Sequence, residues 1–255
     1  TIDDKLVEID SPEKGCWISM VHPDEEEVQR IAQQTGADFD MLKAPLDPEE
    51  RARIDAEDNT SLILVDIPTI EMEGKDFVYS TIPLGILTTE NHLITVCLKD
   101  SHIMRDFAQN HVKGFFTYKK TRFILQILYR NASRYLQYLR QIDKKTNAIE
   151  TELQRTLRNQ ELMQLMRLEK SLVFFATSLK SNEIVLEKLL RSDLIRRFPD
   201  DEDLLEDVII ENKQAIEMCA IYRDILSSTM DAFSSVISNN VNDIMKVLTS
   251  LTLVL

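Results

Sequence analysis

Residues 199–255 read PDDEDLLEDVIIENKQAIEMCAIYRDILSSTMDAFSSVISNNVNDIMKVLTSLTLVL, with no glycine anywhere and no proline after Pro199. Glycine and proline are the residues that most often end a helix, so nothing in this stretch interrupts one. At 1.5 Å per residue such a helix is roughly 80 Å long. Its apolar residues recur every three or four positions, as in a helix that packs against other helices. We therefore predict one unbroken helix from about residue 200 to beyond residue 245.

Charge is distributed unevenly along this predicted helix. Residues 200–211 hold seven carboxylates and no basic side chain, whereas only three charged residues follow Asp224. A helix end in water normally keeps a charged face. The closing residues VLTSLTLVL are too few to cross a bilayer, which takes about 20. They are expected to be the first turns of a transmembrane helix that is cut at Leu255, and a helix buried in a bundle is the competing explanation.

The pattern of apolar residues before Pro199 predicts a second helical unit. Apolar residues follow a heptad seam from Thr121 onward, and a second seam begins after Asn159. A break is expected near Arg158 and Asn159, so the two segments should form a long antiparallel hairpin. The first seam comprises Leu125, Leu128, Ala132, Tyr135, Leu139, Ile142, Ile149 and Leu153, and the second comprises Leu165, Leu168, Leu172, Phe175, Leu179, Leu186 and Leu189.

The first 115 residues hold all five glycines and six of the seven prolines, and therefore form a turn-rich unit. Short apolar runs predict strands, and segments with cap and stop residues predict short helices between them. The predicted strands are 6–9, 16–21, 61–67, 77–87 and 92–98, and the predicted helices are 25–34, 39–42 and a segment capped by Ser101. The fold class is therefore α+β, with an α/β domain that contains a mixed sheet at 1–116, a helical hairpin at 117–198 and a stalk helix at 199–255.

Composition excludes several classes of function. The chain has 255 residues and a formal net charge of -13, which does not suit nucleic-acid binding because that requires a basic surface. The three cysteines form no CxxC pair, so neither a disulfide framework nor a thiolate zinc site is predicted. The four histidines lack metal-ligand spacing, and the glycines needed for a phosphate-binding loop are missing. We predict that the protein is not an enzyme.

The segment 239–249, NNVNDIMKVLT, resembles the stretch that enters the first transmembrane helix of CorA-type magnesium transporters. The strand around Trp17, the HP pair at 22–23 before a helix with VQR, and SLILVDI at 61–67 also resemble the cytoplasmic domain of that family. The resemblance implies a pentamer around one pore, placed on the cytoplasmic side of the inner or plasma membrane. It also implies Mg²⁺ as transported and regulatory ion, with Co²⁺ and Ni²⁺ as further substrates, and a GMN signature beyond Leu255.

The resemblance also assigns roles to positions on the stalk helix. Asp231 matches an acidic residue that forms a ring near the cytoplasmic pore entrance, and Asn242, Met245 and Leu248 match pore-facing residues. Their spacing keeps all four near one helix face. Without the resemblance, Asp231 would be interpreted as a solvated helix charge. Met245 and Leu248 could equally be residues that pack the helices together.

A regulatory magnesium site is also implied. Asp207 matches the stalk carboxylate that shares a magnesium ion between subunits of the family. The partner in the family is a Glu-Asp pair after the second short helix, where this sequence has Lys43-Ala44. A lysine repels a cation, so Asp47 or a stalk cluster of Glu206, Asp207 and Glu211 is expected to substitute.

Two further functions remain open from the sequence. A zinc-transporting paralogue of the same family would share the fold and the signature. A coiled-coil interaction protein without metal would share the heptad seams.

Overall fold

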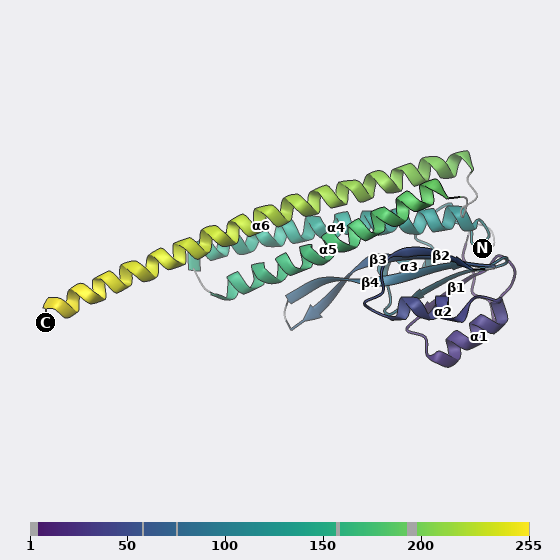
Figure 1. Ribbon diagram of the computed structural model, residues 1–255, viewed down its shortest axis with the longest axis horizontal. Coiled ribbons are helices and arrows are strands. Elements are labelled where there is room, and N and C mark those ends of the chain that lie inside the picture. The colour runs from purple at the N-terminus through teal and green to yellow at the C-terminus, as the bar shows by residue number, and fades with distance from the viewer. Residues whose placement is uncertain (1–4, 58, 75, 157–158, 193–197, 255) are drawn as a thin grey trace.

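The computed structural model describes residues 5–57, 59–74, 76–156, 159–192 and 198–254, with the backbone alone at 76, 155–156, 159, 237–244 and 247–254. Its sheet consists of β1 (Trp17–Val21), β2 (Arg53–Glu57), β3 (Thr60–Glu73), β4 (Asp76–Thr88) and β5 (Leu93–Cys97). The strand order is β1-β5-β4-β3-β2, and β1 runs parallel to β5 while the other pairs are antiparallel. The sheet is therefore mixed, and the protein is α+β as predicted (Figure 1).

Two strand predictions were wrong. Residues 6–9 form no strand, whereas Arg53–Glu57 pairs with β3 and was not predicted. β2 lies at the sheet edge and is only partly buried, so it lacks the apolar run that marks an inner strand. β3 also continues to Glu73, well past the predicted end at residue 67. Pro68 and the polar residues after it concealed this extension, because proline usually argues against an inner strand.

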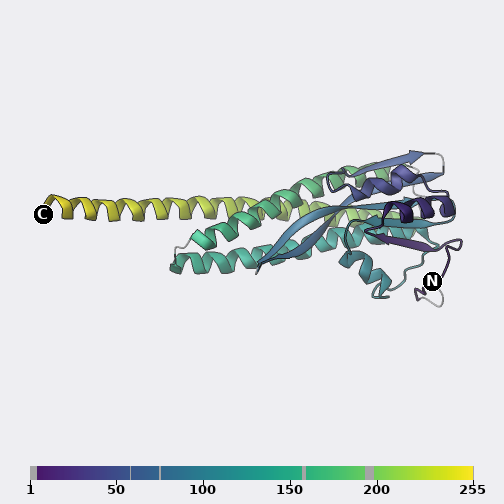
Figure 2. The same cartoon turned by 90° about the horizontal axis from the view of Figure 1, so that it is seen from below.

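Helices cover both faces of the sheet. Successive residues of β3 point to opposite sides, so Leu62 and Leu64 face α1 (Glu25–Thr35) and α2 (Phe39–Lys43). Ile63 and Val65 instead join the core beneath the long helices and α3 (His102–Ala108). Asp24 caps α1 through a capping box with Glu27, and Gly36 ends it with a positive φ. Figure 1 shows α1 and α2 below the strands and the long helices above them, and Figure 2 shows the length of α6 from a second side.

Three long helices make up the rest of the molecule. They are α4 (Lys120–Thr156), α5 (Asn159–Arg191) and α6 (Pro199–Val254). The 56 residues of α6 form a single helix, which confirms the predicted rod. α4 and α5 form the predicted hairpin; their break falls at 157–158, outside the described residues. Figure 1 shows α6 running along the hairpin and continuing past its far end.

One continuous core joins the sheet to all three long helices. Trp17 lies edge-on to Phe123 of α4, with ring centroids 5.3 Å apart, and the same buried cluster includes Leu205 of α6. Apolar side chains from all three predicted segments share this buried cluster. The division into domains at residues 116 and 198 therefore stays a prediction.

A buried polar contact fixes the hairpin to the sheet at Asp66 of β3. The Asp66 main-chain carbonyl accepts hydrogen bonds from Asn131 at 2.9 Å, Tyr135 at 3.2 Å and Asn182 at 2.8 Å. The Asp66 amide in turn donates to Asn182 Oδ1 at 2.8 Å. Burial raises the pKa of the Asp66 carboxyl, and a hydrogen bond with Ser178 offsets part of that rise.

We expect Asp66→Asn to raise the melting temperature at pH 7 by about 2–4 °C. Because the folded-state pKa is raised, folding favours the neutral carboxyl. The stability from this neutral form is complete below the unfolded pKa and is lost as the pH rises through the folded pKa. Asparagine stays neutral and keeps the main-chain contacts. Thermal melts across pH should show the gain at pH 7 and its disappearance below about pH 4; a gain that persists in acid would contradict this assignment.

Candidate functional site

The stalk carboxylates named by the sequence lie on the first turns of α6. Glu206 and Asp207 are exposed, and Glu211 is half-buried. Among the described residues, no group of three or more histidine, cysteine, aspartate or glutamate side chains is close enough together to hold a metal ion. A single copy of the chain therefore supplies isolated carboxylates here. A metal at this end of α6 would need ligands from a second copy or from water.

Lys43 and Ala44 lie far from these carboxylates in the same chain. Lys43 ends α2, where its ammonium group pairs with Glu25 of α1 at 3.2 Å. α2 packs on the face of the sheet opposite the long helices. Asp47 follows the short helix η1 (Ala44–Leu46) and accepts a hydrogen bond from the Glu49 amide at 2.9 Å. The layers of the fold separate this region from Asp207.

The residues assigned to the ion pathway all lie on the distal part of α6. Asp231 is exposed, close to Phe233, the last buried apolar residue described on this helix. Met245 lies further along and is 56% exposed. Asn242 and Leu248 belong to the same helix, but their side chains lie outside the described residues. Asp231 precedes Phe233, which still packs in the core of the hairpin, and α6 continues past the hairpin only beyond that point (Figure 1).

A second apolar stripe on α6 was not predicted. The seam residues Leu205, Cys219 and Leu226 are buried against the hairpin, as expected. On the opposite face, Ile210 is 61% exposed and Ile221 is 55% exposed. Ile225 and Val236 are also exposed and extend the stripe. The isoleucines are 11 and then 4 residues apart, which is roughly three turns and one turn of a helix. This spacing could have predicted the stripe from the sequence.

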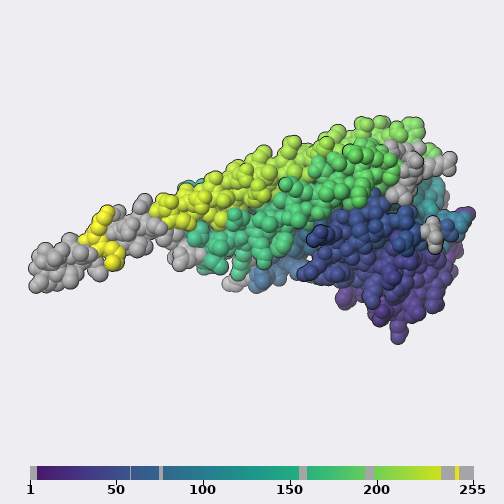
Figure 3. Space-filling model, in the orientation of Figure 1, coloured from purple at the N-terminus to yellow at the C-terminus, as the bar shows by residue number. Residues whose placement is uncertain are grey.

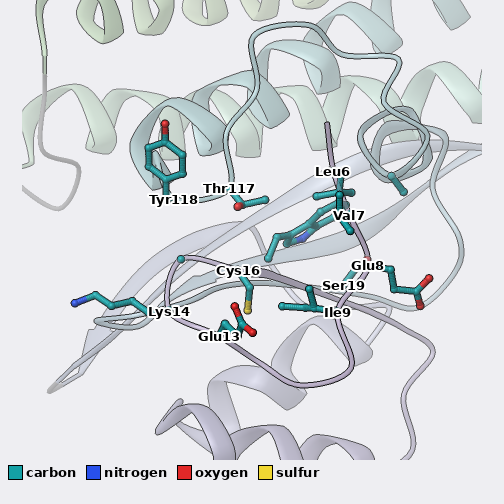
Figure 4. Close-up of a pocket in the computed structure, with 13 residues that line it drawn as sticks. Leu6, Val7, Glu8, Ile9, Glu13, Lys14, Cys16, Ser19, Thr117 and Tyr118 are labelled. Carbon is teal, nitrogen blue, oxygen red and sulfur yellow. The ribbon is translucent and has the colours of Figure 1, made fainter. Parts of the chain in front are cut away.

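A groove lies beneath the N-terminal segment. It measures about 780 Å³ and lies between residues 6–19 on one side and 117–118 on the other (Figure 4). Its polar side chains are those of Glu8, Glu13, Lys14, Ser19, Thr117 and Tyr118, and burial raises the pKa of the Cys16 thiol beside them. A thiol with a raised pKa is a poor nucleophile at neutral pH. No histidine lines the described part of this groove.

The thiol on α6 is likewise structural. Burial raises the pKa of Cys219 to about 11, and its Sγ lies 3.2 Å from the Leu172 carbonyl of α5. Over the residues that the structure describes, no helix has an apolar stretch long enough to cross a membrane.

The arrangement is that of a module built around one projecting helix rather than around a pocket. The family model described as "CorA-like Mg2+ transporter protein" matches residues 12–255. The chain therefore belongs to the CorA family.

Known proteins support this assignment over nearly the whole chain. The cobalt/magnesium transport protein CorA of Methanocaldococcus jannaschii is 27% identical over 261 residues, which cover 98% of this chain and 79% of that protein. The complete structure of the CorA magnesium transporter from the same organism has a TM-score of 0.83 at 26% identity, covering 97% of this chain and 78% of that one. The structure of its soluble domain has a TM-score of 0.76 at 26% identity, covering 84% of this chain and 86% of that one.

Proposed function

We propose that this chain is the cytoplasmic, regulatory and pore-entrance part of a divalent-cation transporter. The observation that carries the proposal is α6, a single helix that begins beside the sheet and runs to Val254 with an apolar stripe left uncovered. The names of the relatives support Mg²⁺ as the transported ion and Co²⁺ as a second one. Ni²⁺ has a similar size and charge and belongs to the same substrate class.

The assembled form is a pentamer, with α6 near the axis and its C-terminal end toward the membrane. Exposed apolar stripes of this length normally cover an interface. Ile210, Ile221 and Ile225 then contact neighbouring copies instead of water. Closed rings arise when each copy presents two different surfaces to its two neighbours.

The ion enters along the distal part of α6. A ring of Asp231 carboxylates concentrates hydrated cations at the mouth, because charges of one sign around a narrow opening focus the field. Asn242 amides hydrogen-bond the water shell of the ion without removing it. Met245 and Leu248 follow one and two turns further on and form an apolar constriction that excludes ions when it dewets.

The regulatory role rests on the proximal carboxylates, and Asp207 is the proposed contributor with Glu206 and Glu211 beside it. Repulsion among carboxylates of adjacent copies opposes assembly, and a divalent cation offsets that repulsion. Mg²⁺ keeps several waters, so these carboxylates act on the hydrated ion. Release of the ion lets the stalks move apart and links cytoplasmic Mg²⁺ to flux.

We expect millimolar Mg²⁺ to raise the melting temperature of the protein, and Asp207→Ala to remove at least half of that shift. Binding of an ion to the folded assembly alone stabilises it by mass action. Asp10→Ala, which removes an exposed carboxylate before β1, is the matched control and should retain the full shift. Equal Mg²⁺ shifts in wild type and Asp207→Ala would exclude Asp207 from the site.

Growth of a bacterial strain that lacks its own magnesium importers tests the proposed function. The full-length gene should restore growth in low-Mg²⁺ medium, and Asp231→Lys should abolish the rescue because a cationic ring repels the ion. Rescue by neither protein, with both present in the membrane, would contradict magnesium import. Sensitivity to added Zn²⁺ without magnesium rescue would favour the zinc-transporting alternative.

A further inference from the structure

A cavity lies between the start of α4 and the start of α6. It measures about 610 Å³, which is within the usual size range of pockets that bind small molecules. Residues 118–122 form one wall, and Phe198, Asp200 and Asp201 form the other. Figures 1 and 3 show the starts of the two helices at the same end of the molecule, far from the C-terminus. The cavity therefore borders the first turn of the stalk helix.

Each wall of the cavity carries an exposed aromatic ring. Tyr118 is 58% exposed and Phe198 is 53% exposed. The ring of Tyr118 lies beside that of Phe116, with centroids 5.5 Å apart, so a neighbouring ring supports it. Both exposed rings keep apolar surface that a flat ligand can cover by stacking.

Basic side chains gather on the α4 wall. The ammonium group of Lys120 donates to the carbonyl oxygens of Thr89 and Glu90 at 2.7 and 2.9 Å, so the turn before β5 holds this lysine in place. Burial lowers the pKa of Lys120, Glu90 opposes this, and the charge of Lys14 lowers the pKa further. Lys119 is exposed next to it. In a chain with a net charge of -13, these lysines form a local positive surface.

The α6 wall contributes carboxylates. Asp201 is buried and pairs with Arg122 of α4 at 3.2 Å, which links the first turns of the two helices. Asp200 is exposed and forms no ion pair with any other residue that the structure describes. Mg²⁺ in proteins is often held by one or two carboxylates together with the phosphates of a ligand. Bases on one wall and a carboxylate on the other thus suit a phosphate chain that carries Mg²⁺.

We propose that this cavity binds a nucleoside polyphosphate together with its Mg²⁺. The phosphates contact Lys119, Lys120 and those N–H groups of Arg122 that Asp201 does not use. Asp200 contacts the hydrated Mg²⁺. The base stacks on Tyr118 and Phe198, and because every base has a flat face, the site selects nucleotides as a class.

A ligand in this cavity joins the start of α4 to the start of α6. Its contacts add to the ion pair between Arg122 and Asp201, and they fix the first turn of the stalk helix against the rest of the fold. The concentration of a phosphate compound can thereby act on the stalk. This consequence rests on the proposed transport function, whereas the binding site itself does not.

Fluorescence titration of the chain with mant-ATP in millimolar Mg²⁺ tests the site. Wild type should show saturable binding that unlabelled ATP displaces. Tyr118→Ala should weaken binding about tenfold through loss of stacking, and Lys119→Glu should weaken it about tenfold through charge reversal. Asp200→Asn should remove most of the difference between the affinities measured with Mg²⁺ and with EDTA.

Lys113→Glu is the matched control, because it reverses an exposed base of the same region outside the cavity. It should bind mant-ATP as wild type does, and circular dichroism melts verify that each variant is folded. Competition then separates nucleotides from other anions. Inorganic triphosphate lacks the base, so it should compete at least about tenfold more weakly than ATP.

Three outcomes would overturn the site. The first is the absence of saturable binding up to about 1 mM mant-ATP. The second is wild-type affinity in both Tyr118→Ala and Lys119→Glu. The third is equal competition by triphosphate and ATP, which would reject a nucleotide as the ligand. Ion uptake by the full-length protein judges transport separately, so the two proposals fail independently.

Discussion

Met245→Ser in the full-length protein is expected to raise basal Mg²⁺ flux about tenfold while the assembly stays intact. Met245 is exposed on α6, beyond the part of the helix that packs on the hairpin. In a ring of copies its thioether side chains form an apolar constriction, which blocks ions by excluding water. A small hydroxyl at this position widens the opening and hydrates it. Flux into vesicles and particle size in detergent measure the two effects.

Packing and gating make opposite predictions for this substitution. If Met245 only packs the helices together, serine lowers assembly stability and flux in parallel. Ile210→Ser is the control, because it removes an exposed apolar side chain from the same helix far from the constriction. It should weaken association without raising flux per assembled particle. Wild-type flux from an intact Met245→Ser assembly would reject the gate.

Gly85→Ala is expected to destabilise the fold by about 2–4 kcal/mol. A Cβ at this position would lie 2.1 Å from Cγ of Pro45. Neither residue can easily move away from this contact. Gly85 pairs with Leu64 and Val96 on the two neighbouring strands, and Pro45 has a rigid ring. Chemical denaturation should show the loss.

Pro45→Ala supplies the second arm of this test. It removes the atom that the new methyl group would meet, so the double variant should be more stable than the sum of the two single losses predicts. A Gly85→Ala protein within about 0.5 kcal/mol of wild type would contradict the close contact. Strictly additive losses in the double variant would assign the destabilisation to another cause.

The sequence predicts those parts of the fold that local rules determine. α6 follows from the absence of glycine and proline after Pro199, and α1 follows from Asp24 and Gly36 at its ends. β2 could not be predicted, because an exposed edge strand is defined by its pairing partner. The extension of β3 beyond Pro68 likewise depends on its ladder with β4. Such long-range pairing leaves no local signal.

The candidate site, like the fold, could be predicted from the sequence only in part. The helical positions of Asp207 and Asp231 follow from the heptad pattern, and both are exposed on α6. Whether carboxylates meet a metal depends on neighbouring copies, which the pattern of one chain does not specify. The outward stripe of α6 was missed because the buried seam of that helix already explained its periodicity. The sequence shows that a helix has two apolar faces, but only the three-dimensional structure shows which face is buried and which is exposed.

Uptake of Mg²⁺, Co²⁺, Ni²⁺ and Zn²⁺ into proteoliposomes that contain the full-length protein directly measures whether it moves divalent cations. We predict saturable Mg²⁺ uptake, competition by Co²⁺ and Ni²⁺, and strong loss of uptake in Asp231→Lys. Uptake of all four ions at the rate of protein-free vesicles would contradict magnesium transport by this protein, and so would uptake of Zn²⁺ alone.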